Sequence, residues 1–356
     1  MASAYPYRET WPFGDEELTI ILLVPRSTAP SPLVLYLPGL GESAEAGNAW
    51  RSAWSRAGYA VASFQTIADA GAWSSAAARN GDFTRQARER FSAKALEARL
   101  RAVAFVAAGI ERRARAGDGV YAQINVQRVA VAGFDIGAQT SLALAGELHP
   151  EKPIVPRLAG LRAALALSPH AILAHGGLAE RFGGISLPVL TVTGSEDTDP
   201  YGLVEAAGLR KAPFKYMPPG DKYQVVIEDG DHRFLSGGGD NLAIPDDVGS
   251  PARDRERGPS GMRRFLEFGG GGMGGPGGGM GRPGGGMGGP PGGGPGRTDE
   301  DHGRRMRQAR QRQTVIVERV STAFLDATVK DDPVAREWLM RDAQRWADPL
   351  ARFEMK

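Results

Sequence analysis

The chain has 356 residues, of which 42% are hydrophobic and 24% are charged, and its formal net charge is +2. This length suits one large or two ordinary domains with a sizeable core, and the nearly balanced charge favours no nucleic-acid partner. Because the chain contains no cysteine, disulfides, a thiolate nucleophile and cysteine-ligated metal sites are excluded.

The apolar stretches of the chain are short. None approaches the roughly 20 residues that a membrane-spanning helix needs, so we expect no membrane span. The start, "MASAYPYRETW", has no charged region followed by an apolar one, so we expect no signal peptide. The small residues after Met1 also fit a trimmed mature form, which leaves both a cytoplasmic and an exported location open. No feature predicts the oligomeric state.

Apolar and β-branched runs recur through the first two thirds of the chain and predict strands at 18–25, 32–39, 60–64, 128–133, 163–169, 188–194 and 223–229. Several runs are continuously apolar, as expected for strands that are covered on both faces. Helical patterns separate many of them, at 84–116, 138–147 and 202–211. This alternation predicts an α/β fold with a mostly parallel sheet of about eight strands flanked by helices.

The composition changes after residue 236. Residues 268–297 are mostly glycine with scattered Met and Pro, and such a segment cannot bury enough surface to offset the entropy of ordering it. Helices are predicted again over 304–329 and 332–346. We therefore expect three parts. Residues 1–236 form a core, residues 237–305 are a disordered low-complexity insertion, and residues 306–356 form C-terminal helices that pack back on the core.

One stretch, "RVAVAGFDIGAQTSLAL" at 128–144, has the rhythm of a strand, a tight turn and a helix. Gly133 and Gly137 flank Asp135 with the spacing of the G-x-S-x-G nucleophile elbow, in which the central residue is normally serine. The elbow places its central side chain at the carboxyl edge of a sheet. The motif therefore predicts a reactive site in which a carboxylate replaces the hydroxyl.

Two partners follow in the order typical of that motif, an acid and then a histidine. Asp197 lies in the acidic loop after the predicted strand at 188–194, and His232 lies in the loop after the strand at 223–229. His232 is the candidate general base, and Asp197 would hold its imidazole in one tautomer. Glu196 and Asp199 remain alternatives for the acid.

Negative charge that develops at such a site needs two backbone N–H donors, which form an oxyanion hole. One donor would be Ile136, directly after the elbow residue. The other would be Leu40, in the glycine-containing loop of "LYLPGLGES" at 35–43.

Several blocks, including "PLVLYLPGLGES", "RVAVAGFDIGAQTSLAL" and "LPVLTVTGSEDTDPYG", resemble the α/β-hydrolase superfamily. The resemblance is to its dienelactone-hydrolase-like and platelet-activating-factor-acetylhydrolase-like branch, which is related to polyester-degrading cutinases. It covers roughly residues 15–236 and 310–340, and relatives of this type are often exported by bacteria.

The resemblance implies an α/β-hydrolase fold and a Ser–Asp–His hydrolase of small-molecule or polymeric carboxylic esters, without metal or organic cofactor. On the family's pattern Asp135 stands at the serine, Asp197 at the acid and His232 at the base. We expect no lid domain, because the interval 170–187 is too short to hold one.

The aspartate is the central departure from this family. A carboxylate that attacks an ester forms a mixed anhydride, and the adduct tends to collapse back because a carboxylate is a far better leaving group than an alkoxide. Aspartate nucleophiles work best at saturated carbon, as in haloalkane dehalogenases and epoxide hydrolases, which resemble this chain at G-x-D-x-G. Those enzymes carry a lid, and a tryptophan commonly stands where this chain has Ile136.

Three hypotheses remain open from the sequence. The first is an ester-hydrolase scaffold that has lost its serine and keeps residual or no ester hydrolysis. The second is a working hydrolase in which Asp135 is the nucleophile or the base that activates water. The third is a binding or interaction protein that uses the former substrate pocket and the glycine-rich insertion.

Overall fold

The computed structural model describes residues 6–75, 81–172, 176–198, 200–204, 206–238 and 296–356, the last with side chains from residue 304. The chain separates into two units, one made of Met1–Gly249 and Gln308–Lys356 and the other of Ser250–Arg307. The first unit holds the sheet and the candidate site. Most of the predicted insertion, 237–305, lies outside the described residues.

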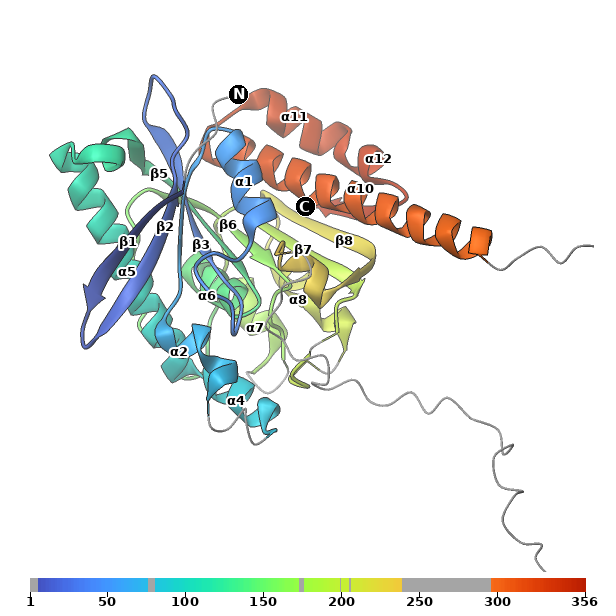
Figure 1. The fold of residues 1–356 in the computed structure, drawn as a ribbon, viewed down its shortest axis with the longest axis horizontal. Helices are drawn as coiled ribbons and strands as arrows, with labels where there is room; N and C mark the ends of the chain where they lie inside the picture. The colour runs from blue at the N-terminus through green and yellow to red at the C-terminus, as the bar shows by residue number, and fades with distance from the viewer. Residues whose placement is uncertain (1–5, 76–80, 173–175, 199, 205, 239–295) are drawn as a thin grey trace, which may run out of the picture. The chain divides into compact units, whose positions relative to one another are not determined.

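A nine-stranded sheet forms the centre of the first unit (Figure 1). Its strands are β1 (Pro6–Phe13), β2 (Glu16–Leu23), β3 (Ser31–Leu37), β4 (Ala60–Phe64), β5 (Ile124–Phe134), β6 (Leu161–Leu167), β7 (Val189–Glu196), β8 (Lys222–Asp231) and β9 (Ala351–Met355). They lie side by side in the order β1-β2-β4-β3-β5-β6-β7-β8-β9. The pairings from β4 through β8 are parallel, whereas β1–β2, β2–β4 and β8–β9 are antiparallel. The predicted α/β class with a mostly parallel sheet is confirmed.

Both faces of the inner strands are buried, which explains their continuously apolar sequences. In β3, Leu33 and Leu35 belong to the core on one face, and Val34 and Tyr36 belong to the core on the other. Successive side chains of a strand point to opposite faces. A strand covered on both sides is therefore mostly apolar along its length.

Helices cover the two faces (Figure 1). They are α1 (Asn48–Arg56), α2 (Ile67–Ala70), α4 (Phe83–Arg90), α5 (Ala93–Ala116), α6 (Ile136–Ala145), α7 (Leu178–Gly183), α8 (Ala212–Tyr216), α9 (His232–Leu235), α10 (Gly296–Val329), α11 (Pro333–Arg341) and α12 (Ala343–Ala347). The core on one face contains residues of α5, α6, α7 and α8. The core on the other contains residues of α1, α10, α11 and α12.

The C-terminal part of α10 packs on the sheet. Val320 and Phe324 are fully buried, and the Trp54 indole N–H of α1 donates to the Ser321 hydroxyl at 2.9 Å. The helix begins at Gly296, earlier than the predicted start at residue 304. Residues from Gln308 onward therefore belong to the same unit as the sheet.

The structure differs from the predictions at several elements. The helix predicted over 202–211 forms only as a short 3-10 helix, Ala207–Lys211, and the helix predicted over 332–346 is divided at Asp342 into α11 and α12. The helix predicted over 84–116 is split into α4 and α5, because the Ser92 side chain caps the N-terminus of α5 by accepting from the Ala95 N–H at 3.3 Å. The edge strands β1 and β9 were not predicted. The first is largely exposed or half-buried and begins with a proline, and the second has only 5 residues, so neither shows a buried-strand pattern.

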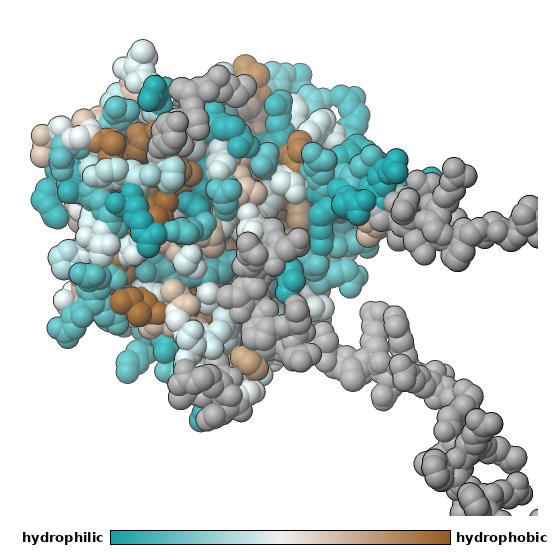
Figure 2. All heavy atoms as spheres, viewed as in Figure 1, coloured by the Kyte–Doolittle hydropathy of each residue, from teal (hydrophilic) through white to brown (hydrophobic). Residues whose placement is uncertain are grey.

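The surface offers little further information. On the face shown in Figure 2, apolar side chains lie in small patches among hydrophilic ones, which is ordinary for a folded protein. None of the helices in the described ranges combines the length and the apolar character that crossing a membrane requires.

Candidate active site

The elbow lies between β5, which ends at Phe134, and α6, which begins at Ile136. Asp135 has φ 54° and ψ −111°, a conformation that non-glycine residues rarely adopt. Its backbone is held on both sides, because its N–H donates to the Leu167 carbonyl at 3.0 Å and its carbonyl accepts from the Gln139 N–H at 3.1 Å. The strained turn places Asp135 at the carboxyl end of β5.

The two glycines of the motif are required by close backbone contacts. A Cβ at Gly133 would lie 2.2 Å from the carbonyl carbon of Gly137, and a Cβ at Gly137 would lie 1.9 Å from the Leu37 carbonyl oxygen. No side chain fits at either distance. The G-x-D-x-G spacing is therefore the signature of this turn.

The Asp135 carboxylate is fully buried and its two oxygens have different surroundings. Oδ2 accepts from the Leu40 N–H at 3.2 Å and from the Tyr201 hydroxyl at 3.1 Å. Oδ1 lies 3.8 Å from Nε2 of His232. The N-terminus of α6 begins at the next residue and favours a negative charge at this position.

His232 is the first residue of α9, directly after β8, and it lies between two aspartates. Its Nδ1 is 3.0 Å from Oδ1 of Asp197 and 2.8 Å from the Ser168 hydroxyl. Its Nε2 has no hydrogen-bond partner among the described residues. With Nδ1–H bonded to Asp197, Nε2 is the basic nitrogen, and it faces Asp135.

The structure distinguishes between the candidate acids. Asp197 is fully buried and contacts His232, whereas Glu196 is exposed at the end of β7. Asp199 lies outside the described residues. Asp197 is therefore the carboxylate that the fold brings to His232, as the chain order predicts.

Three further donors hold Asp197 in place. The Thr193 hydroxyl donates to Oδ2 at 2.8 Å, the Ser168 hydroxyl donates to Oδ1 at 2.9 Å, and Nε of Arg210 lies 3.1 Å from Oδ1. Burial by itself would raise the pKa of Asp197, but the Arg210 guanidinium and the hydrogen bonds from His232 and Thr193 hold this pKa below its usual range. Asp197 is an ionised and immobile partner for the imidazole.

Arg210, Ser168 and Tyr201 were missed by sequence reasoning. Arg210 is fully buried, and its Nη1 donates to the carbonyls of Ser168 and Pro169, each at 3.2 Å. Ser168 has φ 53° and follows β6, so the "ALSP" after that strand was the available signal. Tyr201 lies in the loop after β7, and Arg210 lies in a short 3-10 helix, Ala207–Lys211, before α8. The helix predicted over 202–211 includes Arg210, but nothing in that pattern indicates that its side chain reaches the site.

The two predicted oxyanion-hole residues come from different elements of the fold. Leu40 follows β3, and its N–H is bonded to Asp135 itself. Ile136 is the first residue of α6. Both residues belong to a third apolar cluster, against which the half-buried Trp73 and Leu209 pack. Its buried members are Leu40, Ala72, Ala87, Phe91, Ile136, Ile172, Tyr201, Leu203 and Val204. The Asp135 side of the site is therefore largely apolar.

Glu42 is a further buried carboxyl group in the loop after β3. Its Oε2 accepts from the Gly39 N–H at 2.7 Å. Burial, together with the nearby charge of Asp135, raises the pKa of Glu42 to about 8. At neutral pH the side chain is therefore mostly protonated.

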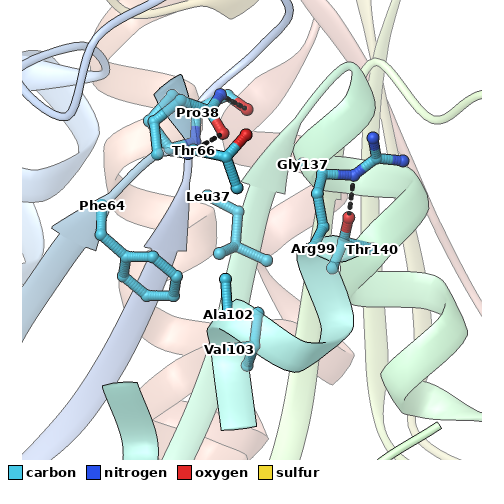
Figure 3. Close-up of a pocket in the computed structure, with 10 residues that line it drawn as sticks. Leu37, Pro38, Phe64, Thr66, Arg99, Ala102, Val103, Gly137 and Thr140 are labelled. Carbon is cyan, nitrogen blue, oxygen red and sulfur yellow. Dashed lines mark hydrogen bonds between the residues drawn. The ribbon is translucent and has the colours of Figure 1, made fainter. Parts of the chain in front are cut away.

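A small cavity lies behind the elbow, between α5, α6 and the ends of β3 and β4 (Figure 3). It has about 10 Å³ of room, enough for about one water. Arg99 borders it and donates to the Thr140 hydroxyl at 2.9 Å and to the Gln139 side chain at 2.6 Å. Arg99 also pairs with Asp69 at 3.7 Å, and the Asp69 carbonyl accepts from the Gly41 N–H at 2.9 Å. This network supports the elbow helix and the loop that carries Leu40.

Within the described ranges, no group of three His, Asp or Glu side chains has an arrangement that could hold a metal ion.

The residues that converge on the site are Asp135, His232, Asp197, Tyr201 and Arg210. They form hydrogen-bonded and ionic contacts with one another.

No protein-family model and no curated protein matches the chain. Among solved structures, it is similar to 2,6-dihydroxy-pseudo-oxynicotine hydrolase, with 16% identity and a TM-score of 0.43 over 64% of this chain and 62% of that chain. It is also similar to a dienelactone hydrolase from Anabaena variabilis, with 16% identity and a TM-score of 0.42 over 66% of this chain and 90% of that chain. The chain thus spans less than two thirds of the length of the first of these proteins.

The chain has the α/β-hydrolase fold. Its parallel strands β3 to β8, the strained elbow between β5 and α6, and the acid and histidine after β7 and β8 form the arrangement expected for that fold. Between β6 and β7, the described residues contain one short helix, α7.

Proposed function

We propose that this chain is a hydrolase in which Asp135 is the nucleophile, His232 the general base and Asp197 the acid that orients it. One observation carries the proposal. Two donors hold Oδ2 of Asp135, while Oδ1 lies on the side of Nε2 of His232, at 3.8 Å. A carboxylate held in this way presents one oxygen for attack and keeps the other among hydrogen-bond donors.

In the first step, Oδ1 of Asp135 attacks a saturated carbon. A new carbon–oxygen bond forms, the bond from that carbon to its leaving group breaks, and the leaving group departs with the electron pair. The product is an alkyl ester of Asp135. The buried and mostly apolar surroundings favour this step, because the negative charge of the carboxylate is dispersed as the bond forms.

In the second step, water attacks the Cγ atom of the Asp135 ester and its proton passes to Nε2 of His232. Negative charge develops on Oδ2, where the Leu40 N–H and the Tyr201 hydroxyl lie. The adduct collapses by breaking the Cγ–Oδ1 bond, and His232 returns the proton to the departing alcohol. Asp135 is left as a carboxylic acid with one oxygen taken from water, and release of its proton to solvent regenerates the carboxylate. Asp197 stabilises the imidazolium in between.

The same geometry opposes the hydrolysis of carboxylic esters. The oxygen of an incoming ester carbonyl would need the Leu40 N–H, but that donor is bonded to Asp135. The second candidate function is therefore a serine-hydrolase scaffold whose ester hydrolysis is impaired by its aspartate. The one observation that favours this second function is the hydrogen bond from the Leu40 N–H to Asp135.

The test is to trap the alkyl ester. The protein and its His232→Gln variant are incubated with a panel of alkyl halides, epoxides and p-nitrophenyl esters, and the elbow peptide is analysed by mass spectrometry. We expect the alkyl group to accumulate on Asp135 in His232→Gln, because without the base the ester is formed but not hydrolysed. Asp135→Asn is the control that cannot form it. Turnover of a halide or epoxide by Asp135→Asn would contradict the proposal.

A further inference from the structure

We propose that Tyr201 is a further catalytic residue, and that its hydroxyl is the second donor to the oxygen on which negative charge develops. This inference rests on the proposed function, in which Oδ2 of Asp135 is that oxygen. The sequence suggested only backbone donors, Leu40 and Ile136. A side chain from the loop after β7 is an additional member of the oxyanion hole.

The geometry is convergent. The Leu40 N–H and the Tyr201 hydroxyl donate to the same oxygen, Oδ2 of Asp135, at 3.2 Å and 3.1 Å. They come from different parts of the fold, the loop after β3 and the loop after β7. A tetrahedral adduct at Cγ requires two donors on the oxygen that becomes negatively charged. Here both donors contact Oδ2, and neither of these two hydrogen bonds is made to Oδ1.

Tyr201 is held in place before any substrate arrives. Its side chain is buried, its carbonyl accepts from the Thr84 hydroxyl at 2.9 Å, and its ring centroid lies 5.2 Å from that of Trp73. Its ring also lies edge-on to the His232 ring, with the centroids 6.2 Å apart. A donor that is already oriented stabilises the adduct without a cost of reorganisation at the moment of reaction.

The two chemical steps make different demands on this hydroxyl. In the free protein it bonds a carboxylate, whose charge is shared by two oxygens. In the alkyl ester it bonds a neutral carbonyl, and in the tetrahedral adduct it bonds a full negative charge on one oxygen. Only interactions that strengthen in the transition state accelerate a step. Tyr201 should therefore accelerate hydrolysis of the ester far more than its formation.

The first test is Tyr201→Phe, which removes the hydroxyl and keeps the ring. With a substrate that alkylates Asp135, we expect the hydrolysis step to slow by about 10²-fold, as is typical for the loss of one oxyanion-hole donor. Formation of the alkyl ester should change little, so the ester accumulates during turnover and is detected by rapid quench and mass spectrometry. A purely structural role would slow both steps or neither.

Tyr121→Phe is the matched control. Tyr121 is also buried, and its hydroxyl also donates to a carboxylate, Oε2 of Glu9 at 2.8 Å, but it lies in the segment before β5 and away from the site. We expect this variant to keep the wild-type rates of both steps. Thermal unfolding of both variants shows that each is folded.

A second background separates this inference from the proposed function. In Asp135→Ser the nucleophile is a hydroxyl, and the developing oxyanion belongs to an ester substrate. We expect Tyr201→Phe in that background to lower kcat for a p-nitrophenyl ester by about 10²-fold with little change in KM. If no alkyl ester forms on the wild-type protein, the proposed function fails, but this loss would still support Tyr201. A folded Tyr201→Phe that keeps full activity in the serine background overturns the inference.

Discussion

Two buried aspartates flank His232, and they differ in what holds them. Asp197 receives hydrogen bonds from Thr193 and Ser168, and Arg210 neutralises its charge. Asp135 sits on a strained turn, and the donors to it, Leu40 and Tyr201, converge on one oxygen. Of the two aspartates, Asp197 is therefore held through both of its carboxylate oxygens. Asp135 is held by these donors through Oδ2, and its Oδ1 lies on the side of His232. Environment can assign different roles to two carboxylates in one site, and the mechanism proposed above gives orientation of His232 to Asp197 and attack on the substrate to Asp135.

The largest expected effect comes from the anchored aspartate. Asp197→Asn removes the negative charge that holds the His232 tautomer, and we expect turnover to fall by about 10⁴-fold. Steady-state kinetics with any substrate of the protein measure this. Glu196→Gln, which changes the exposed neighbouring carboxylate, should leave the rate unchanged. Equal losses of turnover in the two variants would contradict the assignment of Asp197, rather than Glu196, as the acid that orients His232.

The next effect comes from the other aspartate. Asp135→Ser supplies a hydroxyl nucleophile and frees the Leu40 N–H for a substrate oxyanion. We expect p-nitrophenyl ester hydrolysis to rise by about 10³-fold, in line with what an assembled triad adds to the rest of a site. Asp135→Ala also frees the donor but supplies no nucleophile, so it should show no such rise. A folded serine variant that is inactive toward a broad ester panel would favour a binding role.

Arg210 tests the anchoring of Asp197 through stability. Arg210→Gln leaves a buried carboxylate without its cation, and we expect the free energy of unfolding to fall by about 3–5 kcal/mol at pH 7. Because the pKa of Asp197 is lowered in the folded protein, its ionisation stabilises the fold above its usual pKa. This contribution is lost as pH falls through the lower folded value.

The difference between wild type and Arg210→Gln should therefore shrink in acid. Urea unfolding across a pH series measures it, and Arg345→Gln, at an exposed position in α12, is the control. A difference that stays constant down to the acid limit would show that Arg210 acts through packing alone.

The smallest effect concerns Glu42. Its pKa is about 8 in the folded protein, above that of the unfolded chain, so the unfolded state releases the proton first as pH rises. Wild-type stability should fall between about pH 5 and pH 8, by on the order of 1 kcal/mol per pH unit from this group. Glu42→Gln should remove that part of the slope.

Glu147 is also buried, with a pKa of about 7, and it contributes in the same direction. The comparison is therefore between the wild-type and variant slopes in urea unfolding. Glu17→Gln, at an exposed position in β2, is the control. An unchanged slope in Glu42→Gln would show that Glu42 is ionised in the folded protein.

The predictable part of the site is the part that backbone geometry determines. Gly133 and Gly137 are required by contacts that exclude a Cβ, so the elbow is visible as a spacing. The acid and histidine follow buried strands, so Asp197 and His232 could be found by their order. Tyr201 reaches the site from a loop and Arg210 from a short 3-10 helix, Ala207–Lys211, and no period or motif there indicates the direction of either side chain. The edge strands β1 and β9 escaped prediction for a related reason, because exposed strands lack the apolar run of the inner ones.

The most direct test of the central claim follows the oxygen atoms. Excess protein is given a substrate that it turns over once, in heavy-oxygen water, and the elbow peptide is then analysed by mass spectrometry. If Asp135 is the nucleophile, the heavy oxygen appears in the Asp135 carboxylate after the first turnover, and the product alcohol carries an oxygen from the protein. If the product carries the heavy oxygen and Asp135 carries none, Asp135 only activates water, and the proposed covalent mechanism is wrong.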